Sequence, residues 1–273
     1  MVQKYSVCFR MNETHQEEGD GMRLKGKVAV VTGGGTGIGE AIAKAFAQEG
    51  AAVVVTGRRK PVLEQVVREI EREGGRALAV PGSVTVEADV RAAVDATVRA
   101  YGRVDVLVNN AGNLFHAGPL HETSDQVWNE TLDIFLTGTF RFTRAIIPHM
   151  LKQGGGSIIN ISTVGALKAM PFFPGHAYQA AKAGVVMFTK TVALHYAKDK
   201  IRCNCICPAA VETPGTAAWI KDPKIRAMMD GIHPLGRMGR PDEIAPPAVY
   251  FASDESQWTT GAILPVDGGV MAA

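Results

Sequence analysis

The sequence lacks any run of about 18 uninterrupted apolar residues, the length that a membrane-spanning helix needs. It also lacks a charge excess, because 29 basic residues stand against 27 acidic ones and the formal net charge is +2. A chain so nearly balanced has no electrostatic footprint for nucleic acid or for an anionic membrane surface. We therefore expect no membrane span and neither nucleic acid nor membrane as a partner.

Cysteine is scarce, with four in 273 residues. Three of them alternate as Cys203-x-Cys205-x-Cys207, a pattern that could suggest a metal or redox site. Zinc sites, however, usually have wider ligand spacings and a second ligand pair. A strand buried on both faces commonly packs free cysteine as a small hydrophobic residue. The pattern therefore favours core packing, and we expect no metal.

The first 21 residues have no apolar core of the kind found in signal peptides, and their acidic residues argue against a transit peptide. They are polar and aperiodic, so residues 1–21 are predicted to form a flexible extension. The default location is the cytoplasm. Residues 22–273 have the length of one large domain.

Short apolar runs alternate with helical periodicity throughout this domain. The predicted strands are residues 28–32, 53–56, 77–80, 104–108, 157–161, 201–207 and 262–266. The predicted helices lie near residues 38–49, 61–73, 86–101, 124–152, 177–198 and 241–253. Strict alternation predicts an α/β fold in which a doubly wound, seven-stranded parallel sheet carries helices on both faces. Residues 213–240 depart from the alternation and, with a helix near 216–229, are predicted to form a lid.

A glycine-rich turn joins the first predicted strand to the first helix. Glycine permits a tight turn and a close approach of a pyrophosphate to the helix N-terminus, as in a Rossmann-type dinucleotide site. The candidate cofactor-binding residues in this turn are Gly33, Gly35, Thr36, Gly37, Ile38 and Gly39.

The end of the second strand carries Gly57, Arg58 and Arg59 where a dinucleotide fold often has an acidic residue. A carboxylate there would bind the ribose 2′-hydroxyl, whereas arginine suits a 2′-phosphate. This favours NADP(H) over NAD(H), which stays possible. The alternative is a solvated basic pair at a helix start.

Tyr178 and Lys182 are four residues apart in a predicted helix, so their side chains share one face. A free phenol titrates near 10, and a nearby ammonium lowers that pKa toward a range useful for proton transfer. The alternative is an ordinary pair of surface neighbours.

Together these features resemble the short-chain dehydrogenase/reductase family, over roughly residues 22 to 270. The matching motifs, in chain order, are Thr32-Gly33-x-x-x-Gly37-x-Gly39, Asn109-Asn110-Ala111-Gly112, Tyr178-x-x-x-Lys182 and Pro208-Ala209-x-Val211-x-Thr213. The resemblance implies an NAD(P)-dependent oxidoreductase, with Tyr178 as acid/base and Lys182 holding the nicotinamide ribose. It also implies a homotetramer or homodimer whose helices near 124–152 and 177–198 pack across an interface. Further cofactor contacts implied in this way are Asn110, Ala111, Gly112, Pro208, Ala209, Val211 and Thr213.

The chain departs from the family pattern at several positions. Thr163 stands where the family has its catalytic serine, and because the spacing to Tyr178 is longer than usual, Ser162 is the alternative. Phe135 stands where the family has a relay asparagine, and phenylalanine cannot hold a relay water. Ser83, followed by Val84, replaces an aspartate near the adenine.

The leading hypothesis is hydride transfer between NADP(H) and a carbonyl or secondary alcohol. The rivals are a cofactor-binding paralogue with weak or no catalysis, motivated by Phe135 and Thr163, and a reductase of conjugated double bonds. Apolar residues in and near the lid predict a fairly apolar small-molecule substrate. These residues are Leu114, Phe115, Phe172, Phe173, Trp219, Ile220, Met228 and Met229.

Overall fold

The computed structural model describes residues 21–112, 117–170 and 175–273. Seven parallel strands form one sheet in the order β3-β2-β1-β4-β5-β6-β7, which confirms the predicted fold class. The strands are β1 Val28–Thr32, β2 Ala52–Gly57, β3 Arg76–Pro81, β4 Val106–Asn109, β5 Gly156–Ile161, β6 Ile201–Pro208 and β7 Ile263–Val266. The predicted extension lies outside the described residues, apart from Gly21.

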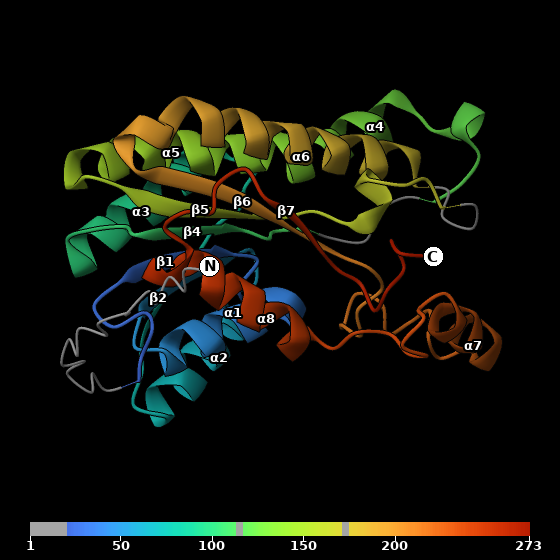
Figure 1. Cartoon of the computed structure of the whole chain (residues 1–273), viewed down its shortest axis with the longest axis horizontal. Helices are drawn as coiled ribbons and strands as arrows, with labels where there is room; N and C mark the ends of the chain where they lie inside the picture. The colour runs from blue at the N-terminus through green and yellow to red at the C-terminus, as the bar shows by residue number, and fades with distance from the viewer. Residues whose placement is uncertain (1–20, 113–116, 171–174) are drawn as a thin grey trace, which may run out of the picture.

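Helices cover both faces of the sheet (Figure 1). One face carries α1 Gly37–Gln48, α2 Lys60–Arg72 and α8 Pro241–Ala252. The other carries α3 Glu87–Tyr101, α5 Gly138–Gln153 and α6 His176–Tyr196, with the short α4 Asp125–Leu132 at one end. In the described part of the chain, no helix combines the length and the apolar character needed to cross a membrane.

The central strands are buried on both sides, which explains their continuous apolar runs. In β1, Ala29 and Val31 belong to the core beneath α1 and α8, whereas Val30 belongs to the core beneath α3 and α5. The β6 cysteines follow the same rule: Cys203 and Cys205 are free thiols with no exposed surface. Within the described residues, no group of three His, Cys, Asp or Glu side chains could hold a metal.

Two helix predictions were wrong in detail. The stretch 124–152 is not one α-helix, because a π-helical turn, Asp133–Thr137, separates α4 from α5. The lid helix α7 spans Pro223–Gly231 rather than 216–229, and Asp222 caps it by accepting a hydrogen bond from the backbone N–H of Lys224. Proline at the first helical position explains the later start.

Candidate active site

A cavity of about 1030 Å³ opens at the carboxyl ends of the strands. Its lining includes the β1–α1 turn, the ends of β2, β4, β5 and β6, the first turns of α6 and the segment before and within α7. A parallel sheet places binding sites at this edge. Every predicted cofactor-binding and catalytic residue lines the cavity except Gly39, which lies behind the glycine turn.

The glycine turn has the backbone geometry of a phosphate cradle. Gly33 and Gly37 adopt φ values of +66° and +60°, a region that favours glycine. A Cβ on Gly39 would overlap the Gly33 carbonyl and the side-chain amide of Asn110. The sequence therefore folds into this turn only with glycine at position 39, and the turn leaves the N-terminus of α1 open to the cavity.

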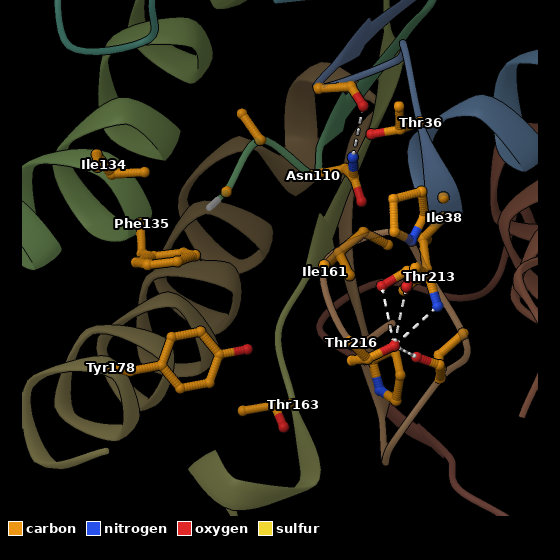
Figure 2. A pocket seen from close by; sticks show the side chains of 18 of the residues that line it. Thr36, Ile38, Asn110, Ile134, Phe135, Ile161, Thr163, Tyr178, Thr213 and Thr216 are labelled. Carbon is orange, nitrogen blue, oxygen red and sulfur yellow. Dashed lines mark hydrogen bonds between the residues drawn. The ribbon is translucent and has the colours of Figure 1, made fainter. Parts of the chain in front are cut away.

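Asn110 ties the glycine turn to the end of β4. Its side-chain amide donates to the carbonyl oxygens of Thr32 at 3.0 Å and Gly33 at 3.3 Å. Figure 2 shows Asn110 beside the glycine turn. In return, the Thr32 hydroxyl accepts from the backbone N–H groups of Asn110 and Ala111, both at 3.0 Å. These bonds fix two cofactor-facing loops relative to each other.

A buried amide network, which sequence reasoning missed, supports the site from behind. Asn109 donates to Asn160 at 2.9 Å and to Thr143 at 3.1 Å, and Asn160 donates to Thr189 at 2.8 Å. The network joins β4 and β5 to α5 and α6, so it sets the position of the helix that carries Tyr178. Asparagine within an apolar strand pattern was the available signal, because a buried amide requires partners.

The catalytic candidates gather at the other end of the cavity. Tyr178 and Thr163 lie near each other at this end of the cavity, as Figure 2 shows, and the threonine hydroxyl is near enough to act on the pKa of the phenol. Ser162, by contrast, is buried and donates its hydroxyl to the Lys182 carbonyl at 2.9 Å. The Lys182 ammonium donates to the Ile161 carbonyl at 2.6 Å. The geometry thus brings Thr163, rather than Ser162, to the phenol.

The pKa values of the pair move in opposite directions. Burial raises the pKa of Tyr178 to about 12, opposed by the hydrogen bond from Thr163. Burial lowers the pKa of Lys182 to about 8, opposed by the thiols of Cys205 and Cys207. The expected lowering of the tyrosine pKa is not met in this structure. The ammonium lies 5.8 Å from the phenol ring centroid, and desolvation outweighs its field.

Comparison with known proteins agrees with this geometry. Residues 33–271 match the family described as enoyl-(acyl carrier protein) reductase. The chain is 38% identical to the 3-oxoacyl-[acyl-carrier-protein] reductase of Thermotoga maritima, over 92% of this chain and 100% of that protein. It is 42% identical to 3beta-hydroxysteroid dehydrogenase 1 of Eggerthella lenta, over 90% of this chain and 94% of that protein.

Solved structures show the same likeness. A short-chain type dehydrogenase/reductase from Mycobacterium marinum superposes with a TM-score of 0.88 at 32% identity, covering 93% of this chain and 99% of that one. An actinorhodin polyketide ketoreductase variant solved with NADPH superposes with a TM-score of 0.85 at 34% identity, covering 89% of this chain and 97% of that one. The chain belongs to the short-chain dehydrogenase/reductase family. It is an NAD(P)-dependent oxidoreductase of carbonyl and alcohol groups.

Where the resemblance predicts the adenosine of the cofactor, at the ends of β2 and β3, Arg58 and Arg59 are exposed and line the cavity. The Arg59 guanidinium donates weakly to the Thr36 hydroxyl at 3.4 Å, which places it beside the glycine turn. Ser83 and Val84 line the same end. The Ser83 N–H donates to the Asp89 carboxylate at 2.8 Å, so a carboxylate supports this loop from behind.

Where the resemblance predicts the nicotinamide, beside Val211 and Thr213, Thr216 organises the loop after β6. Its hydroxyl donates to the Val211 carbonyl at 2.8 Å and accepts from the Thr213 N–H at 2.9 Å (Figure 2). The cavity also reaches Pro208 and Ala209. Sequence reasoning missed Thr216, although a threonine three residues after Thr213 in a loop is a common local capping pattern.

The apolar wall is partly as predicted. Trp219, Ile220 and Met229 line the cavity, whereas Met228 is 43% exposed and does not. Residues 114–115 and 172–173 lie outside the described residues. Wall residues that the sequence analysis missed are Ile134, Val164, Met170, Ile232 and Val270. Val270 comes from the turn after β7, so residues distant in sequence build this end.

Proposed function

We propose that this enzyme uses NADPH to reduce a bulky, apolar ketone, and that it oxidises the matching secondary alcohol in reverse. The observation that carries the proposal is the hydroxyl pair of Tyr178 and Thr163, which lies between the glycine turn and an apolar wall. A carbonyl oxygen held by both hydroxyls would place its carbon toward the nicotinamide end of the cavity.

Each residue has a defined part in this proposal. Tyr178 donates its proton to the substrate oxygen during reduction, and Thr163 orients that oxygen by a second hydrogen bond. Lys182 keeps its positive charge near the developing phenolate at neutral pH, because its pKa is about 8. The nicotinamide cofactor supplies the hydride when it is bound. Positioning and charge are the contribution of the protein.

The residues present fit a dinucleotide. A Cβ at Gly39 would collide with the Gly33 carbonyl and the Asn110 amide behind the turn, so glycine keeps the turn in shape, and the turn and the start of α1 line the cavity. Arg58 and Arg59, with Gly57 in place of an acidic residue, support NADP(H) over NAD(H). The actinorhodin ketoreductase that resembles this chain was solved with NADPH, which supports the same preference.

The wall supports the substrate class. Trp219, Ile220 and Met229 offer apolar surface beside the hydroxyl pair, and apolar pockets bind ligands of matching character. One relative is named as a hydroxysteroid dehydrogenase, which is consistent with a large apolar substrate. A homotetramer or homodimer and a cytoplasmic location stay predictions.

A second candidate is reduction of a conjugated carbon–carbon double bond, because the matching family is described by enoyl reduction. The two chemistries share fold and cofactor, but the carbonyl product is an alcohol and the enoyl product keeps its carbonyl. The two relatives, named for oxoacyl reduction and for hydroxysteroid dehydrogenation, favour the first. The non-catalytic paralogue is disfavoured by the intact Tyr178 and Lys182.

The test measures oxidation of NADPH and of NADH with bulky alicyclic ketones, short ketones and enones, with product identification by mass spectrometry. We expect alcohol products, faster turnover with NADPH and with bulky ketones, and loss of turnover in Tyr178→Phe. Calorimetry should show that Tyr178→Phe still binds NADPH. Turnover that survives in Tyr178→Phe would overturn the assigned acid/base.

A further inference from the structure

Phe135 lies at the centre of the catalytic group, not at its edge. The ring is 4% exposed and sits in the π-helical turn Asp133–Thr137. It meets the Tyr178 ring at 4.9 Å between centroids, with an interplanar angle of 85°, an edge-to-face contact (Figure 2). The Lys182 ammonium lies 5.0 Å from the Phe135 ring centroid, within the range of a cation–π interaction.

The surroundings of Phe135 are built for a ring. A Cβ on Gly112 would lie 2.7 Å from the Phe135 Cε1, so the end of β4 leaves space for the aromatic side chain only with glycine there. The Phe135 carbonyl, in the π-helical turn, accepts a hydrogen bond from the Thr139 hydroxyl at 2.9 Å. A side chain of the protein therefore already donates a hydrogen bond to this oxygen.

We propose that Phe135 is a positioning residue that holds the Lys182 ammonium against its ring face and fixes the Tyr178 ring through its edge-to-face contact. The inference rests on the proposed function. In this arrangement the Lys182 ammonium is held by the quadrupole of the Phe135 ring and by the backbone carbonyl of Ile161. These two groups take the place of the relay asparagine and its water in the family pattern. After donating its proton, Tyr178 then takes up another proton from the cavity, because the Phe135 ring blocks the side of the phenol that faces the π-helical turn.

The electrostatic surroundings of Lys182 allow a direct measurement. The titratable groups beside it are Tyr178 on α6 and the thiols of Cys205 and Cys207 on β6. A cation–π interaction favours the charged form of the amine, so weakening the ring quadrupole must lower the pKa of Lys182 below about 8. Progressive fluorination of phenylalanine weakens the quadrupole while it largely keeps the shape of the ring.

The experiment incorporates mono-, di- and trifluorinated phenylalanine at position 135 of the full chain and follows the Lys182 Cε resonance by NMR through a pH titration. We expect a stepwise fall of the Lys182 pKa, reaching about one pH unit in the trifluoro variant. The pH above which ketone reduction declines should fall in parallel. Phe142, a core residue of the following helix with 1% exposure, is the matched control and should leave both quantities unchanged on fluorination.

Phe135→Leu and Phe135→Asn add a second measurement. Phe135→Leu should lower kcat roughly tenfold and lower the Lys182 pKa like the trifluoro ring. In thermal unfolding, Gly112→Ala should destabilise the wild type more than it destabilises Phe135→Asn, since the clash with the ring is removed. A Lys182 pKa that does not respond to fluorination would overturn the inference even if turnover is normal. Absence of turnover in the wild type, with a responsive Lys182 pKa, would instead contradict the proposed function.

Discussion

Ser162 and Thr163 show how two adjacent hydroxyls take different tasks. The backbone stays extended just after β5, with φ −159° and ψ 154° at Thr163, so the two successive side chains point to opposite sides. The Ser162 hydroxyl therefore faces helix α6 and the Thr163 side chain faces the cavity. Ser162 donates to the Lys182 carbonyl, and the Thr163 hydroxyl lies near the Tyr178 phenol and lowers its pKa. Sequence reasoning left both open because the register of the following loop is not encoded in a local motif.

This difference predicts different mutant phenotypes. Thr163→Val removes the hydroxyl but keeps the shape, and we expect kcat for ketone reduction to fall about a hundredfold, while Thr163→Ser restores most of it. Ser162→Ala should act mainly on stability, lowering the free energy of unfolding by about 1 kcal/mol. Steady-state kinetics and urea unfolding of the three variants test whether Thr163 acts on turnover and Ser162 on stability. Equal loss of kcat in Thr163→Val and Ser162→Ala would contradict it.

Lys182 gives the stability a defined pH dependence. Its pKa falls from 10.5 to about 8 on folding, so between these values the unfolded chain binds more protons than the folded one. Stability from this group therefore rises with pH across that window, and the penalty of the buried ammonium is fully present below it. The expected gain is on the order of 3 kcal/mol.

The measurement is urea unfolding of the wild type and of Lys182→Met at pH 7.5, 8.5 and 9.5. The wild type should gain stability relative to the variant as pH rises. A constant difference between the two would show that the ammonium is not destabilised in the fold. Lys190→Met, on the exposed side of the same helix, is the matched control.

At the scale of elements, the sequence predicts the repeated alternation of strands and helices but not the π-helical turn that interrupts a helical stretch. Alternating apolar runs and helical periods were enough to predict a seven-stranded parallel sheet with helices on both faces, because burial on both faces imposes that pattern. The sequence analysis did not predict the π-helical turn, since the stretch near residues 124–152 reads as one helix. The position of the π-helical turn depends on the tertiary packing of Phe135 and of Gly138. A Cβ added to Gly138 would lie 2.7 Å from the Val84 side chain.

The strand–turn–helix unit makes the sharpest prediction at this scale. Gly39→Ala places a methyl group against the Gly33 carbonyl and the Asn110 amide, so the turn must shift. We expect NADPH affinity to fall more than tenfold and stability to fall by about 1–3 kcal/mol. Gly231→Ala, where nothing lies within 4 Å of the added Cβ, is the matched control for calorimetry and thermal unfolding. Unchanged affinity in Gly39→Ala would show that the turn does not contact the cofactor.

The lid helix α7 is held by Arg226. Its guanidinium pairs with Glu212 at 2.6 Å, at the base of the lid, and with Asp230 at 2.7 Å on the same helix. Arg226→Gln should therefore loosen the wall that carries Met229 and raise the KM for a bulky ketone roughly two- to fivefold, with a smaller effect on kcat. Because salt screens the ion pairs of Arg226, the KM of the wild type for the bulky ketone should rise with salt concentration. Arg91→Gln, which breaks a surface pair with Glu87 on α3, is the control and should change neither.

At the scale of the molecule, the site exists only because distant segments meet. The cavity joins the β1 turn, the end of β5, helix α6, the lid and Val270 near the C-terminus, which the pattern of any one segment does not reveal. The sequence predicted the polar and glycine residues through their motifs. It missed wall residues such as Met170 and Ile232, since apolar residues carry no local signal for facing a cavity rather than the core.

The outer surfaces of α5 and α6, which lie over the same sheet face in Figure 1, bear on assembly. Met187 and Leu194 lie seven residues apart on one face of α6 and are 63% and 77% exposed, and Phe140 on α5 is 40% exposed. Apolar side chains so exposed at helical spacing are typical of an interface between copies.

If α6 forms that interface, Leu194→Glu places a charge in it and should convert the native oligomer into a smaller species. Analytical ultracentrifugation of the full chain measures this directly. Val86→Glu, 44% exposed at the start of α3, is the matched control and should leave the mass unchanged. Because α6 also carries Tyr178 and Lys182, the smaller species should have a lower kcat. An unchanged mass in Leu194→Glu would place the interface elsewhere.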